Sequence, residues 1–141
     1  MDKTTTEVER PAWLKPGAEV VTWYPQSRSG SGVSRGRVKS VAGQSFLLED
    51  EREPRFKIKG MEARTGSGWD RTTKRVAHAE SPEGVYWLAN LAATIRRQAA
   101  DSATVTWQKE RTLQSAADLR QALSEWMSAT AILDAMERPK R

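Results

Sequence analysis

The chain has 141 residues, of which 38% are hydrophobic and 29% are charged, and it contains no cysteine, so disulfides, thiolate metal sites and cysteine nucleophiles are excluded. Most of the net charge of +5 belongs to residues 1–80, which hold 15 Lys/Arg against 11 Asp/Glu, and such an excess favours acidic partners such as nucleic acid. No apolar run approaches the ~18 residues that a membrane span needs, and residues 1–7 lack the apolar stretch of a secretory signal, so we expect a cytoplasmic protein with no membrane partner.

Residues 1–10 are polar and without period, which predicts a disordered leader. Short strands are predicted at residues 19–24, 35–42, 45–49, 55–59, 62–64 and 74–78, the segment at 62–64 being weak. The clearest alternation puts Phe46 with Leu48, and Phe56 with Ile58, on one face of a hairpin. Strands at regular spacing with glycine at the corners predict a small five-stranded antiparallel β-barrel over residues 11–80.

The pattern changes at Ser81, which suits a helix N-cap, with Pro82 and Glu83 following in the first turn. Apolar residues then recur at helical spacing, first at Val85, Leu88, Ala92, Ile95 and Ala99 and then at Ala116, Leu119, Leu123, Trp126, Ala129, Leu133 and Met136. A turn is predicted at residues 109–114, and Ser115 with Asp118 resembles a capping box. Residues 81–137 are therefore expected to form an antiparallel α-helical hairpin with a free tail at 138–141, which makes the chain α+β.

The segment Trp13-Leu14-Lys15-Pro16-Gly17-Ala18-Glu19-Val20-Val21, a proline-glycine followed by a valine strand, resembles the opening of Src-homology-3-like barrels of the Tudor and KOW type. The Gly36-Arg37-Val38 strand and the Phe46 and Phe56 hairpin add to this resemblance. The whole chain is similar to short proteins of actinobacterial phages, in which a barrel with an Arg-Phe strand (Arg55-Phe56) precedes a helical pair ending in Leu-x-x-Ala-Leu-x-x-Trp, here residues 119–126. The resemblance implies a phage-encoded protein, and it brings no activity and no functional residues.

A basic strand face is one candidate site. No acidic residue lies between Val20 and Leu48, and alternation would put Arg35, Arg37 and Lys39 on one side of their strand. The candidate nucleic-acid-binding residues are Arg28, Arg35, Arg37, Lys39, Arg71, Lys74 and Arg75. Beside exposed aromatic rings such as Trp23, Tyr24 or Trp69, they could follow a phosphate backbone while bases stack.

Six tryptophans are many for a chain of this length, and exposed tryptophan is a common anchor of protein interfaces. The candidate interface residues are Trp69, Trp87, Trp107 and Trp126, of which the last three could instead pack the helices. We therefore expect a protein partner, or self-association through the helices, with DNA or RNA as the alternative.

Catalysis has little support in the sequence. The single histidine, His78, has no serine or aspartate motif tied to it, and the acidic cluster Glu49, Asp50, Glu51 and Glu53 suits a solvated turn. We expect no catalytic residue, metal, cofactor or small-molecule substrate. The hypothesis is a non-enzymatic protein-binding adaptor or host-directed modulator that uses the helical hairpin and barrel rim; the alternative is a sequence-tolerant nucleic-acid-binding protein.

Overall fold

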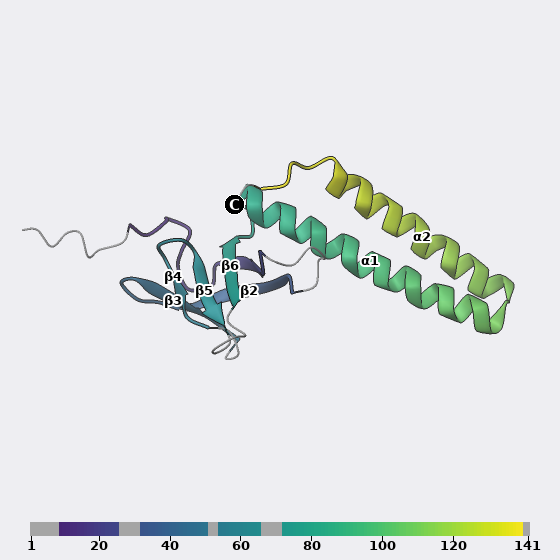
Figure 1. The fold of residues 1–141 in the computed structure, drawn as a ribbon, viewed down its shortest axis with the longest axis horizontal. Helices are drawn as coiled ribbons and strands as arrows, with labels where there is room; N and C mark the ends of the chain where they lie inside the picture. Colours follow the sequence, from purple (N-terminus) through teal and green to yellow (C-terminus); the bar gives the residue numbers. More distant parts are fainter. Residues whose placement is uncertain (1–8, 26–31, 51–53, 66–71, 140–141) are drawn as a thin grey trace, which may run out of the picture.

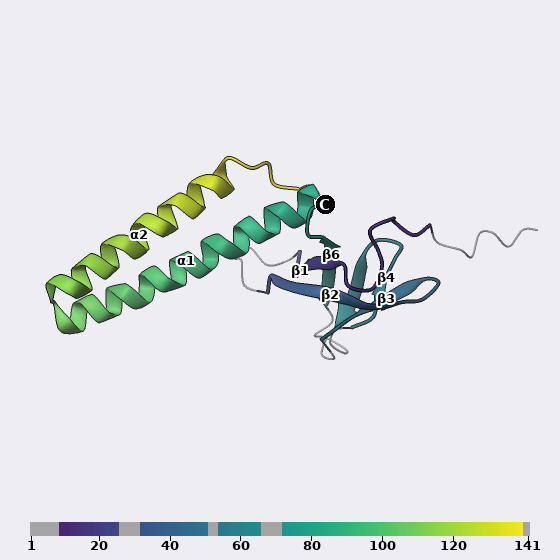
Figure 2. The ribbon, with the colours of Figure 1, turned by 180° about the vertical axis from the view of Figure 1, so that it is seen from behind.

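The computed structural model describes residues 9–25, 32–50, 54–65 and 72–139. Among these residues, six antiparallel strands close into a barrel and two long helices follow it. The two helices lie side by side and extend well beyond the barrel, as both views show (Figures 1 and 2). The α+β class and the order of barrel and helical hairpin are therefore confirmed.

The strands follow one another around the barrel in chain order: β1 (Glu19–Trp23), β2 (Ser34–Val41), β3 (Ser45–Leu48), β4 (Phe56–Lys57), β5 (Glu62–Thr65) and β6 (Thr72–His78). β6 pairs with β1 and closes the barrel. The predicted count of five strands is wrong because β5 is a full member, paired with β6 from Glu62 to Thr65. Its sequence has little β propensity, so the strand owes its conformation to its neighbours.

The interior of the barrel is filled as the alternation predicted. Phe46 and Phe56 face each other across β3 and β4, with ring centroids 5.6 Å apart, and both are fully buried. Leu48 and Ile58 point the same way, while Lys57 and Lys59 are exposed. The remaining members of this core are Leu14, Val20, Val38, Ala63 and Val76.

A second core joins the barrel to the helices. β1 is buried on both faces, because Val20 points into the barrel while Val21 and Trp23 point outward. Outside the barrel, Trp23 stacks on Trp87 of the first helix, with ring centroids 5.4 Å apart. Leu133 and Met136, at the other end of the hairpin sequence, pack against the same cluster. The base of the hairpin is therefore docked on the barrel wall.

Helix α1 (Pro82–Glu110) begins as the sequence predicts, with Ser81 as N-cap accepting from the Gly84 amide at 3.0 Å. Helix α2 (Leu113–Asp134) begins differently. Its N-cap is Thr112, and the Thr112 and Ser115 side chains each accept from the other's backbone amide at 3.0 Å. The predicted Ser115–Asp118 box is therefore wrong by one turn, and Ser115 is the second member of the real one.

Candidate functional site

The apolar face that the sequence predicts for α1 is not the face that the hairpin buries. On α1 the buried residues are Gly84, Tyr86, Trp87, Ala93 and Ala100. Val85 and Ile95 of the predicted stripe stay exposed instead. The helix carries apolar residues on more than one side, and docking on Trp23 selects the side with the larger aromatic rings.

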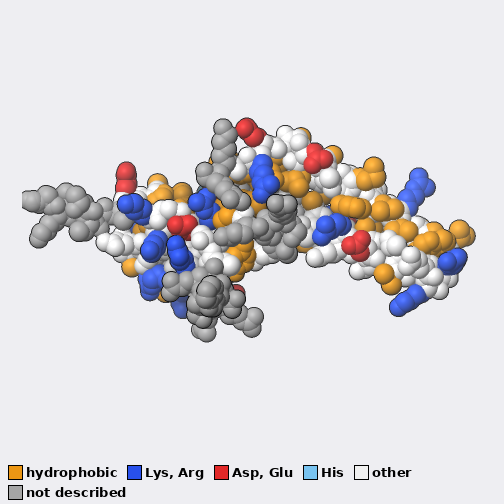
Figure 3. Space-filling view, viewed as in Figure 1, with side chains coloured by type: hydrophobic (Ala, Val, Ile, Leu, Met, Phe, Trp, Pro, Cys, Tyr) orange, Lys and Arg blue, Asp and Glu red, His pale blue; other side chains and the backbone are white. Residues whose placement is uncertain are grey.

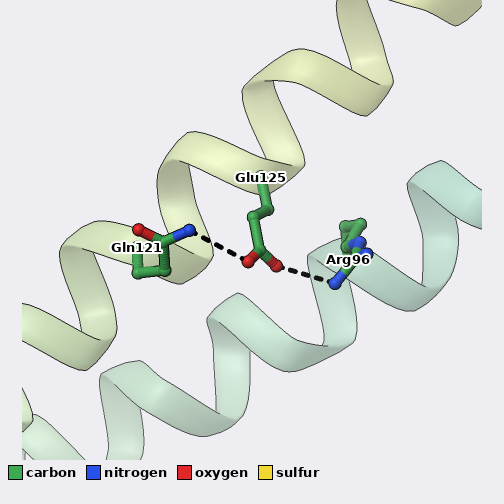
Figure 4. Close-up of polar contacts among 3 residues, drawn as sticks. All are labelled: Arg96, Gln121 and Glu125. Atoms are coloured by element: carbon green, nitrogen blue, oxygen red, sulfur yellow. Dashed lines mark hydrogen bonds and ion pairs between the residues drawn. The ribbon is translucent and has the colours of Figure 1, made fainter.

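One side of the hairpin is held by polar contacts. Arg96 of α1 donates to Glu125 of α2 at 2.7 Å, and Gln121 donates to the other oxygen of the same carboxylate at 3.1 Å (Figure 4). Gln114 and Asp118 form a further hydrogen bond along α2. These side chains are partly or well exposed, so the contacts add little to stability, and of the three only Arg96–Glu125 joins the two helices.

A different side of α2 is apolar. We call the residues Ala116, Leu119, Leu123, Met127 and Ala131 the α2 stripe; with Arg120, Ser124 and Ser128 they line a shallow groove of 620 Å³. Met127 is 70% exposed and Leu123 38% exposed. On the face seen in Figure 3, hydrophobic side chains gather along the hairpin and at its free end. Large apolar side chains left in water in this way mark interaction surfaces.

Among the described residues, the predicted tryptophan anchors do not line this groove. Trp87 is only 7% exposed and belongs to the second core, so it is a structural residue. Trp107 and Trp126 are half-buried, and Trp69 lies outside the described residues. The residues that sequence reasoning left out are Leu113, Met127 and Ile132, which are 91%, 70% and 62% exposed. The sequence does indicate that some apolar residues of α2 are exposed, because α2 has more of them than one helix face can bury.

The basic strand face is mixed in charge. Arg35, Arg37 and Lys39 are all exposed on β2, but a register shift between Val38 and Ser40 interrupts the alternation at Lys39. Arg37 pairs with Glu19 at 3.4 Å. The pocket of 440 Å³ beside Arg35 and Arg37 is lined by three acidic residues, Glu19, Glu49 and Asp50.

The two described residues of the second predicted basic cluster, Lys74 and Arg75, do not share a surface. Lys74 is 8% exposed, and its Nζ lies 5.4 Å from the centre of the Tyr24 ring. Arg75, the next residue, points to the opposite face and is half-buried, because side chains alternate along a strand. Arg28 and Arg71 lie outside the described residues.

His78 is half-buried and its ring stacks on Trp13, with centroids 4.9 Å apart. Within the described residues, none of the hydrogen bonds uses its imidazole, and no three His, Asp or Glu side chains gather as metal ligands would. In the same part of the chain, no helix combines the length and apolarity of a membrane span.

The described residues thus define a closed barrel with a projecting two-helix arm and an apolar groove on that arm. Comparison of the chain with protein-family models, with curated proteins and with solved structures gives no match.

Proposed function

We propose that the chain is a non-enzymatic protein-binding module, an adaptor or host-directed modulator whose docking surface is the α2 stripe. The observation that carries this proposal is the exposure of Met127 and Leu123 in a groove whose other lining residues include Ala116, Leu119 and Ala131. Covering such a surface removes apolar area from water, which stabilises a complex by about 25 cal/mol per Å² of buried area. A protein surface of matching shape is the natural ligand.

The architecture supports the same proposal. The second core fixes the base of the hairpin on the barrel through the Trp23–Trp87 stack. The arm is thereby held in one orientation, with α2 on the side of α1 away from the barrel (Figure 1). A preorganised surface loses less entropy on binding than a mobile one. The phage origin and the Src-homology-3-like character that the sequence resemblance implies remain predictions beside this proposal.

Capture from an extract of the cells that make the protein tests the proposal. We expect the tagged wild-type chain to retain a protein partner, and Met127→Asp to lose it, because burying a charge in an apolar interface is costly. Ser102→Asp adds the same charge at an exposed position on α1 and should retain the partner. Equal retention by wild type and Met127→Asp would contradict the assignment of the surface.

Sequence-tolerant nucleic-acid binding is the second candidate, and the exposure of Arg35, Arg37 and Lys39 on one strand favours it. Titration with labelled single-stranded DNA and RNA at two salt concentrations tests it. If β2 binds phosphates, affinity falls steeply with salt, and Arg35→Gln should flatten the slope by about one. Arg64→Gln, on the exposed side of β5, should leave the slope unchanged. The absence of binding at low salt eliminates this candidate.

A further inference from the structure

A charged residue lies on the same face of the helix near each end of the α2 stripe, Arg120 at one end and Asp134 at the other. Counted from Met127, Leu123 lies four residues before it and Ala131 four residues after it, while Arg120 and Asp134 lie seven residues away on either side. Positions separated by four and seven residues share one face of a helix. Met127, Leu123 and Ala131 belong to the groove, and so does Arg120; Asp134 falls on the same face by its spacing.

This face is complementary to itself when two copies of α2 run antiparallel about a two-fold axis at Met127. Leu123 of one chain then lies opposite Ala131 of the other, so a large side chain meets a small one. Arg120 lies opposite Asp134, so opposite charges meet twice, once on each side of the axis. A two-fold interface requires this reciprocity, in which residue i contacts j and j contacts i.

The charges at the two ends have no ion-pair partner among the residues that the structure describes. Among the described residues, neither Arg120 nor Asp134 forms an ion pair, and both are exposed. Asp134 is moreover the last residue of α2, whose final turn holds no basic residue. A carboxylate there is disfavoured by the helix dipole, and an arginine supplied by a second chain would relieve it.

We infer that the protein that covers the α2 stripe is a second copy of this chain, and that the two hairpins form a four-helix arrangement about Met127. This inference rests on the proposed function, since it names the partner of the same surface. The polar side of the hairpin, with Arg96 and Glu125, stays outside the interface. The contact is a small one centred on a single helix pair, so the dimer is expected to be weak and concentration-dependent.

Sedimentation equilibrium of the full chain over a range of concentrations tests the inference by charge reversal. Wild type should dimerise, and Arg120→Glu or Asp134→Arg alone should raise the dissociation constant about tenfold or more, because each places two like-charge pairs across the axis. The double variant Arg120→Glu/Asp134→Arg should restore the dimer. Arg64→Glu, on the exposed side of β5, makes the same charge change as Arg120→Glu and should leave dimerisation unchanged.

The outcomes separate this inference from the proposed function. A wild-type chain that is monomeric at every concentration overturns the inference, and so does a double variant that dimerises no better than the single ones. If that monomer still captures another protein and loses it on Met127→Asp, the proposed function stands with a different partner. Far-UV circular dichroism checks that each variant keeps its helices.

Discussion

Gly84→Ala is expected to lower the free energy of unfolding by about 2–3 kcal/mol or more, because it adds a methyl group where the helix meets the barrel. Gly84 is buried in the first turn of α1. A Cβ at this position would overlap the carbonyl oxygen of His78 and press on the backbone of Ala79. That carbonyl cannot move freely, since it also accepts from the amide of Ser81 at 3.0 Å and from its hydroxyl at 2.6 Å.

Urea unfolding followed by circular dichroism measures the change. The matched control is Gly43→Ala in the exposed turn between β2 and β3, where a Cβ meets no atom within 4 Å. This control should stay within about 0.5 kcal/mol of wild type. If Gly84→Ala unfolds at the same urea concentration as Gly43→Ala, the close approach of Gly84 to the His78 carbonyl is incorrect.

Trp87→Ala is expected to cost about 3–5 kcal/mol, the usual range for removing a large buried aromatic side chain. The Trp87 ring stacks on Trp23 and meets the edge of Tyr86 at a centroid distance of 5.2 Å. It is the main aromatic link between barrel and arm, so its loss should weaken the docking of the hairpin as well as total stability.

The measurement is again urea unfolding, now recorded by both circular dichroism and tryptophan fluorescence. Trp87→Phe keeps a ring in the stack and should recover much of the loss. Trp107→Ala, at a half-buried position near the free end of α1, should cost clearly less than Trp87→Ala. A larger effect at Trp107 would mean that the helix pair, and not its junction with the barrel, dominates stability.

The barrel could be predicted where the sequence alternates cleanly. Phe46, Leu48, Phe56 and Ile58 are buried as expected, because a period of two settles which face of a strand is apolar. The segment of β5 from Glu62 to Thr65 has only Ala63 as a buried residue. Its place in the barrel depends on pairing with β6, which a local pattern does not reveal.

The candidate site was harder to predict, because exposure depends on which face docks. Lys74 and Val76 are two residues apart on β6, so their side chains lie on the same face of the strand. Because Val76 points into the barrel, Lys74 points inward as well. Lys74 and Arg75 read in sequence as one basic cluster, yet they lie on opposite faces. Likewise, the burial of Trp87 follows from its contact with Trp23, which is 64 positions earlier in the sequence, so a local pattern does not reveal it.

Peroxide oxidation of methionine tests most directly whether the α2 stripe is covered by protein in solution. Oxidation rates follow exposure, and Met127 is 70% exposed in the single chain while Met136 and Met61 are half-buried internal references. We predict that Met127 oxidises faster than Met136 and Met61 in dilute protein and becomes several-fold slower as the chain is concentrated or meets its partner, with Met136 and Met61 unchanged. A constant rate at Met127 under all these conditions would contradict the account.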